Sequence, residues 1–448
     1  MAWGFTMHPY LEEVRPTLAL AVPIIVGQLS QMLMGITDSV MIGHTGVVPL
    51  AASAFGGNVF SVFYVVGIGL MLPVAVFVAR AQGSSQPEEA AEYLRHGVWL
   101  AVIFGALEMS VIGALSGVLT WFQQPPEVLA IVTPFFLWIG SSIVSVLVYL
   151  ALRQFAEAMG HPWIPMLVML GGVGLNIFLN WILIYGHLGV PALGLTGAGI
   201  STFISRALGA WVIFEWLRRD PRMRAAWPRQ WFARLSWGRL RVMLGLGVPA
   251  SGSLLFESGA FAAAAIMIGW LGTVPLAAHQ VAMSCVTFTF MVVLGLSMAA
   301  GMRISAAVGA GNLGRVRTIG ASALGLGALF ATGCMVLYFF AGHAIAGWFV
   351  RDTTVITLTA QLLVVAALFQ LFDGSQVIGA AALRGLGDVK VPAIITFAAY
   401  WLVSIPLGYF VGVHGAFGAV GIWGALATGL ALAAVFLGWR FARLTQCR

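Results

Sequence analysis

Apolar residues run along the chain in twelve long stretches that are separated by short polar segments. A helix needs about 20 apolar residues to cross the hydrocarbon layer of a bilayer, and every stretch reaches that length. Strands of a membrane barrel would be about 10 residues long and would alternate in polarity, a pattern that these stretches lack. The pattern predicts membrane helices over residues 17–40, 50–78, 98–120, 130–152, 163–186, 194–217, 242–268, 276–300, 318–341, 355–378, 391–413 and 418–439.

The composition supports this prediction. Of the 448 residues, 60% are apolar and only 8% are charged, whereas a soluble chain has about 25% charged residues. A soluble globule of this size could not cover its surface with so few charges. The apolar fraction also excludes a disordered chain, and the 55 glycines follow no collagen period. We therefore expect an all-α integral membrane protein.

Basic residues predict the orientation of the helices. Of the 22 lysines and arginines, 20 lie in the terminal segments or in alternate connecting segments, and Arg351 is the one basic residue of the opposite connectors. Because basic connectors stay in the cytoplasm, both termini are expected to be cytoplasmic. The first stretch follows Arg15 without a convincing small-residue cleavage site, so we expect a membrane helix there rather than a signal peptide. No basic amphipathic stripe is present, so nucleic acid is not an expected partner.

The chain also contains an internal duplication. The segment VPLAA occurs at 48–52 and again at 274–278. Aligning these two segments, with shifts of one or two positions further along, pairs Pro23 with Pro249, Gly160 with Gly387, Pro165 with Pro392, Gly194 with Gly418, and Gly197 with Gly421. A register kept across half of the chain is strong evidence for a repeated unit.

Six spans in each copy is an even number, so both copies enter the membrane in the same direction. The expected architecture is a parallel repeat with a substrate site near the interface of two pseudo-symmetric six-helix lobes. The N-lobe is predicted to cover residues 1–217 and the C-lobe residues 242–448. The arginine-rich linker 218–241 is expected to set the orientation and to attract anionic lipid.

Enzyme motifs are missing from the sequence. Neither H-E-x-x-H nor G-x-S-x-G occurs, and the only lysine, Lys390, follows Val389 and cannot belong to a phosphate-binding P-loop. The single G-x-G-x-x-G match, residues 309–314, lies between two predicted helices without a preceding strand. The three cysteines form no C-x-x-C pair, so neither a disulfide framework nor a thiolate metal site is expected. We expect neither an enzyme nor a cofactor.

Two charged residues inside the predicted spans are expected to be structural. A charge within the bilayer costs about 2.5–3.5 kcal/mol on insertion scales, so each one needs a reason. Glu108 has no polar residue beside it on its helix, and a structural hydrogen bond is expected. Arg206 is expected to pair with a carboxylate such as Asp38 or Glu215.

Three acids inside the spans are expected to be functional: Asp38, Glu257 and Asp373. The duplication provides the argument, since the matching positions in the other repeat are uncharged. The fold therefore does not require these carboxylates. The uncharged counterparts are Ala264 for Asp38, Gln31 for Glu257 and Val146 for Asp373.

Polar residues on later spans favour Asp38 as part of a cation site. Asn176 and Asn180 are four residues apart and share a helix face, and Thr202 lies on the next span. One carboxylate, two amide oxygens and one hydroxyl would form an oxygen cage for a hard cation such as Na⁺. The alternative is a cluster of hydrogen bonds between helices, which the residue types do not exclude.

These residues occur in segments that resemble multidrug and toxic compound extrusion (MATE) transporters, most closely the bacterial NorM-type branch. The resemblance covers nearly the whole chain and rests on PIIVGQLSQMLMGITDSVMIGHTG, NIFLNWILIYG, LLFES, LAAHQVAM and LFDGSQVIGA. It implies two six-helix lobes around a central cavity, in a monomer of the bacterial cytoplasmic membrane. It also implies export of small-molecule drugs, mostly amphipathic organic cations, in exchange for Na⁺ or H⁺.

The resemblance assigns roles to particular residues. It implies an N-lobe cation site formed by Asp38, Asn176, Asn180 and Thr202, and substrate-binding or proton-coupling acids at Glu257 and Asp373.

Two positions depart from the pattern of the NorM-type branch. Phe369 stands one turn before Asp373, where an aromatic hydroxyl is common, and Ser284 follows HQVAM, where asparagine is common. The first departure removes a potential oxygen ligand for Na⁺ from the C-lobe. Together with Arg206, these two residues are expected to modulate the sites.

A flippase for lipid-linked glycans, of related build, is the alternative function. Its pyrophosphate substrate would require several basic residues in the cavity, whereas three acids and one Arg206 lie inside the spans. This balance favours a cationic substrate. A membrane-embedded transferase is less favoured still, because no D-x-x-x-D metal pair occurs.

Overall fold

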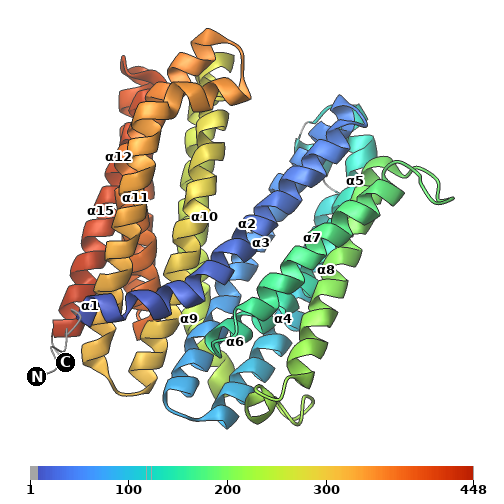
Figure 1. The fold of residues 1–448 in the computed structure, drawn as a ribbon. Helices are drawn as coiled ribbons and strands as arrows, with labels where there is room; N and C mark the ends of the chain where they lie inside the picture. The colour runs from blue at the N-terminus through green and yellow to red at the C-terminus, as the bar shows by residue number, and fades with distance from the viewer. Residues whose placement is uncertain (1–8, 118, 123, 447–448) are drawn as a thin grey trace, which may run out of the picture. The chain divides into compact units, whose positions relative to one another are not determined.

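The computed structural model describes residues 9–117, 119–122 and 124–446, which form helices and turns without any strand (Figure 1). Twelve helical spans in these residues are long and apolar enough to cross a membrane, which confirms the predicted fold class. The spans are α2 (Val14–Gly43), α3 (Val47–Gly83), α4 (Pro87–Ser116), α5 (Pro126–Ser141) with α6 (Ile143–Ala158), α7 (Trp163–Leu183), α8 (Gly194–Arg219), α9 (Trp237–Trp270), α10 (Thr273–Gly309), α11 (Leu313–Phe349), α12 (Thr353–Leu386), α13 (Lys390–Phe397) with the segments that follow it, and α15 (Gly418–Gln446).

Every predicted stretch overlaps one of these spans, but most observed helices are longer. Helices α3, α10 and α11 each have 37 residues, because their polar ends continue beyond the apolar stretch. The predicted stretches 98–120 and 163–186 instead run past the helix ends at Ser116 and Leu183, since apolar residues continue into the following turns. Residue 118, in the first of these stretches, lies outside the described residues.

Contacts divide the chain into two units whose boundaries fall inside helices. One unit combines Met1–Ile25 with Gly252–Arg448, and the other is Val26–Ser251. The two cuts lie two residues after Pro23 in α2 and Pro249 in α9, where the missing proline N–H weakens the helix. The predicted lobes 1–217 and 242–448 differ from these units at α2 and α9. The first half of α2 belongs to the unit with Gly252–Arg448, and the first half of α9 belongs to the unit Val26–Ser251. The lobes themselves remain a prediction.

Ion pairs hold the first half of α2 in the unit that contains the second repeat. Glu13, which directly precedes α2 and is buried, accepts hydrogen bonds from Arg303 of α10 and from Nε of Arg315 of α11, the latter at 2.7 Å. Arg303 also donates to the Thr17 hydroxyl and, at 2.9 Å, to the Glu13 carbonyl.

Ion pairs with the opposite charge order hold the first half of α9 in the other unit. Nη1 of Arg239 on α9 lies 3.3 Å from Oε2 of Glu92 on α4. Nη2 of Arg95 lies 2.8 Å from the same carboxylate oxygen. The register that aligns the two VPLAA segments also pairs Glu13 with Arg239. The two repeats therefore use opposite charges at matching positions.

Replacing Arg303 by alanine is expected to destabilise the protein by about 1–3 kcal/mol, because the buried Glu13 carboxylate and carbonyl lose charged donors. The measurement is the thermal unfolding midpoint of the purified protein. The matched control is Arg440→Ala, which breaks the more exposed pair with Asp388 and should cost less than about 1 kcal/mol. Equal shifts for the two variants would contradict the expectation.

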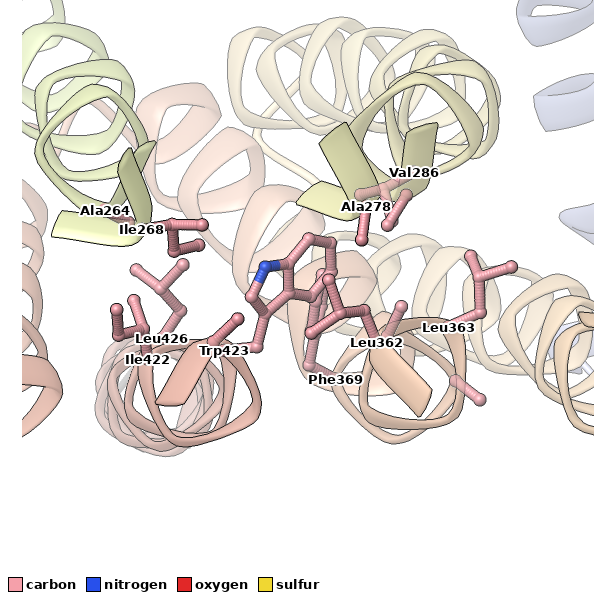
Figure 2. Close-up of a cluster of buried hydrophobic side chains, with 14 of the residues drawn as sticks. Ala264, Ile268, Ala278, Val286, Leu362, Leu363, Phe369, Ile422, Trp423 and Leu426 are labelled. Atoms are coloured by element: carbon pink, nitrogen blue, oxygen red, sulfur yellow. The ribbon is translucent and has the colours of Figure 1, made fainter. Parts of the chain in front are cut away.

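An apolar cluster forms the core of the unit with Gly252–Arg448, where α9, α10, α11, α12 and α15 supply most of its side chains (Figure 2). Trp423 of α15 and Phe369 of α12 are both buried, with ring centroids 5.6 Å apart. The Trp423 indole donates to Nδ1 of His279 at 3.1 Å, so its single polar atom is satisfied. Elsewhere in this unit, α10 and α12 approach each other closely at two glycines. A Cβ at Gly385 on α12 would lie 2.8 Å from the Gly301 carbonyl oxygen on α10, so a larger residue at Gly385 would push the helices apart.

Candidate cation and substrate sites

The unit Val26–Ser251 contains a cavity of about 190 Å³ between α2, α3, α6, α7 and α8. Its lining is mainly apolar, with methionine, valine and leucine side chains, three glycines, and the side chains of Tyr149 and Ser205. Asp38 and Gln31 of α2, Tyr64 of α3 and Arg206 of α8 add polar groups. Gln31 donates a hydrogen bond to the Tyr64 hydroxyl. An apolar cavity with a few converging polar groups is the usual form of a small-molecule site.

Three of the four predicted N-lobe residues meet beside this cavity. Asn180 Nδ2 donates to Asp38 Oδ1 at 2.6 Å and to Asn176 Oδ1 at 3.3 Å. Both asparagines are fully buried. The prediction that Asn176 and Asn180 share a face next to Asp38 agrees with these contacts.

The fourth residue, Thr202, is also buried, but its hydroxyl donates to the Ala198 carbonyl of its own helix at 2.9 Å. Among the described residues, no hydrogen bond joins Thr202 to Asp38, Asn176 or Asn180. Its role as a ligand stays a prediction.

The amide groups of this cluster are incompletely satisfied. Within the described residues, the buried Oδ1 of Asn180 and Nδ2 of Asn176 have no hydrogen-bond partner. An unpaired buried polar atom costs about 1–3 kcal/mol. Rotation of the Asn180 amide would turn an oxygen toward Asp38, and a cation between them would satisfy both groups. The donor set therefore fits a hard monovalent cation.

Arg206 does not form the predicted direct ion pair, although it lines the same cavity as Asp38 and the two attract each other electrostatically. Its Nη1 donates to the Ser142 hydroxyl at 2.8 Å, and its guanidinium carbon lies 5.1 Å from the centre of the Phe60 ring. No carboxylate within the described part of the chain lies within ion-pair distance of it. Ser142 stands at the break between α5 and α6, and this hydroxyl with the aromatic face replaces a carboxylate partner.

The structural hydrogen bond expected for Glu108 is also absent. Its two carboxylate oxygens are buried and have no partner among the residues that the structure describes. Glu108 is not among the residues that line the cavity. It is a buried acid outside the candidate site.

In the other unit, Glu257 of α9 and Asp373 of α12 are close enough to repel each other electrostatically. Glu257 is half-buried and Asp373 is buried. Gln376 of α12 donates to Glu257 Oε2 at 3.5 Å, and the hydroxyl of Tyr400 donates to Gln376 Oε1 at 3.2 Å. The structure thus adds Gln376 and Tyr400 to the two predicted acids.

The two departures from the family pattern have structural positions of their own. The Phe369 ring packs in the apolar cluster against Trp423 (Figure 2). Ser284 is half-buried, and its hydroxyl donates to the Gln280 carbonyl at 2.9 Å within α10. Their effect on transport stays a prediction.

Sequence reasoning missed four polar residues: Gln31 and Tyr64 in one unit, and Gln376 and Tyr400 in the other. A signal existed for Gln31, because it is the duplicate of Glu257. Single polar residues in apolar helices are otherwise hard to separate from ordinary hydrogen-bonding positions.

The described residues form twelve helical spans long and apolar enough to cross a membrane, with a cavity that Asp38 lines in one unit and a pair of acids in the other. These features are typical of a multi-pass membrane transporter. The sequence model of the MatE family matches residues 23–182 and 249–410. The chain belongs to the MatE family.

Proteins of known name support this assignment. The chain is 36% identical to the "Probable multidrug resistance protein NorM" of Pseudomonas putida, over 96% of each chain. It is 34% identical to the multidrug resistance protein NorM of Burkholderia vietnamiensis, covering 95% of this chain and 93% of that protein. The fold matches a crystal structure of a Vibrio cholerae MATE transporter with a TM-score of 0.90 over 98% of each chain, at 21% identity.

Proposed function

We propose that the protein exports amphipathic, mostly cationic compounds across the bacterial cytoplasmic membrane by antiport with Na⁺ or H⁺. The observation that carries this proposal is the half-buried Asp38 carboxylate, which lines a mainly apolar cavity. Beside it lies the Asn180 amide, whose oxygen has no partner within the described residues. The acid can bind a small cation, and the apolar wall can bind the body of a drug. The multidrug resistance names of the relatives support the same function.

The mechanism is competition between the coupling ion and the substrate. A ligand shifts a conformational equilibrium only by its difference in affinity for the two states. Binding of Na⁺ or H⁺ to the acids would therefore favour one of two conformations, in which the cavity opens to one side of the membrane. Binding of drug would favour the conformation that opens to the other side. One pH unit supplies about 1.4 kcal/mol per proton, and a potential of 100 mV supplies about 2.3 kcal/mol per charge.

The proposed orientation places both termini in the cytoplasm, and the proposed active form is a monomer. The alternative substrate, a lipid-linked glycan, is less well supported. Its pyrophosphate would require several basic groups, and Arg206 is the one basic residue that lines the described cavity. The acids in both units favour a cationic substrate.

Cells that produce the protein are expected to extrude ethidium faster than cells that produce Asp38→Asn at matched abundance. Efflux is measured from fluorescence while external Na⁺ and pH are varied separately. Faster efflux on raising external Na⁺ alone would identify Na⁺ as the coupling ion, and faster efflux on lowering external pH alone would identify H⁺. Equal ethidium retention in producing cells, Asp38→Asn cells and cells without the protein would contradict the proposed function.

A further inference from the structure

The span from Lys390 to His414 contains two π-helical segments, η3 (Ala398–Ser404) and η4 (Tyr409–His414), around the short α14 (Ile405–Gly408). Such segments are rare and occur frequently at functional sites. Tyr400 lies in η3, and its side chain is completely buried. Building on the proposed function, we infer that Tyr400 and Gln376 make the C-lobe acids select a proton over Na⁺.

The orientation of the Gln376 amide follows from hydrogen-bond chemistry. While Glu257 is ionised it only accepts hydrogen bonds, so the group that faces it in that state is the amide NH₂. The amide oxygen then faces Tyr400, whose hydroxyl has a single proton and donates it at 3.2 Å. Tyr400 thus fixes Gln376 with its nitrogen, rather than its oxygen, 3.5 Å from Glu257.

An amide NH₂ beside the acid favours a proton over a metal cation. Na⁺ needs several oxygen ligands, and an amide N–H cannot serve as one. A proton needs only one carboxylate oxygen. The further oxygen that Na⁺ would require is absent at position 369, where the Phe369 ring belongs to the apolar cluster (Figure 2).

The duplication shows how the two repeats differ at this point. The span that contains Asn176 and Asn180 in one repeat corresponds to the span that contains Tyr400 in the other, since Pro165 in the first matches Pro392 in the second. Beside Asp38, this span presents asparagines, one of which has a buried amide oxygen without a partner within the described residues. Beside Glu257, the corresponding span presents a hydroxyl that occupies the amide oxygen of Gln376. Within the described residues, the amide oxygen of Asn180 is therefore available to a cation beside Asp38. The amide oxygen of Gln376 is not, because it accepts the hydrogen bond of Tyr400.

Other charged and titratable groups also act on Glu257. Asp373 and Arg384 of α12 interact with it electrostatically, the first by repulsion and the second by attraction, and Tyr400 faces it from η3. The repulsion between two neighbouring carboxylates favours uptake of one proton by the pair. This effect reinforces the selection for a proton.

The test measures binding of radioactive Na⁺ to purified protein in the Asp38→Asn background, which removes the N-lobe carboxylate. This protein is expected to bind little Na⁺. Adding Tyr400→Phe keeps the ring and removes the hydroxyl, so Gln376 can turn its oxygen toward Glu257. Na⁺ binding is then expected to rise at least tenfold. The matched control is Tyr409→Phe, a half-exposed tyrosine on the same span, which should leave Na⁺ binding unchanged.

A second variant, Gln376→Met, distinguishes this role from a general structural one. It removes the amide donor without adding an oxygen, so Na⁺ binding should stay low. Loss of the donor disfavours the ionised Glu257, so protons should displace bound ethidium at a higher pH than in the Gln376 protein. This variant decides the inference if Tyr400→Phe does not fold.

Strong Na⁺ binding by the Asp38→Asn protein, or no gain on adding Tyr400→Phe, would overturn the inference. An unchanged pH of displacement in Gln376→Met would do the same. Failure of the unmodified protein to bind or export ethidium would instead contradict the proposed function, and the Na⁺ measurements would still decide the ion preference of the C-lobe acids.

Discussion

Replacing Asp38 by asparagine is expected to abolish ion-driven efflux almost completely while drug binding is largely retained. The substitution keeps the shape of the side chain and an oxygen that can accept the hydrogen bond from Asn180, now 2.6 Å long. It removes the charge that, in the proposed function, binds the coupling ion. Drug is still expected to bind at Glu257 and Asp373, and protons can still displace it there, but without ion binding at Asp38 the gradient is not expected to drive net export.

The measurement is drug efflux from proteoliposomes under an imposed Na⁺ or proton gradient, together with equilibrium drug binding. Glu108→Gln is the matched control, because it removes a buried membrane acid that does not line the cavity. This control should transport normally. Full gradient-driven efflux by Asp38→Asn would show that coupling resides elsewhere, with Glu257 and Asp373 as the remaining acids.

Neutralising either C-lobe acid, by Glu257→Gln or Asp373→Asn, is expected to lower efflux sharply while membrane abundance stays near that of the unmodified protein. The other repeat has Gln31 at the position of Glu257 and Val146 at that of Asp373, so the helices tolerate uncharged residues at both sites. Gln31 even donates a hydrogen bond to Tyr64 in its own unit, which shows that glutamine can be satisfied there. A loss of efflux in these variants would then result from the loss of the negative charge at the site and not from a loss of folding.

Drug resistance of cells at matched protein abundance is the measurement for these two variants. The thermal unfolding midpoint of each purified variant serves as the control for folding. Unchanged resistance in both variants would exclude these acids from transport. A large fall in the unfolding midpoint would assign them a structural role instead.

The spans could be predicted from the sequence, because burial in lipid requires about 20 apolar residues in a row and the chain has few charges. The proximity of Asp38, Asn176 and Asn180 was also predictable. A spacing of four residues fixes a common helix face, and a buried polar face needs a polar partner. These features depend on local periodicity and on the cost of burying charge.

The contacts that could not be predicted depend on local irregularity or on distant packing. Arg206 binds Ser142 because the helical span breaks between α5 and α6, and hydropathy does not reveal such a break. Tyr400 reaches Gln376 from a π-helical segment, where the residue-to-face relation of a regular α-helix no longer holds. For Glu108 a hydrogen bond was expected because buried polar groups are usually paired, but its carboxylate has no partner within the described residues.

The ion pairs of Glu13 and Arg239 bear on how the two repeats diverged after duplication. In the register that matches these two residues, Arg315 corresponds to Glu89, and Glu92 corresponds to Thr318. An assembly of two copies of the first repeat would therefore bring Glu13 toward another acid, and two copies of the second repeat would leave Arg239 without its carboxylate. The repeats have become complementary halves, so that a protein divided into two polypeptides at the linker would assemble by joining unlike partners.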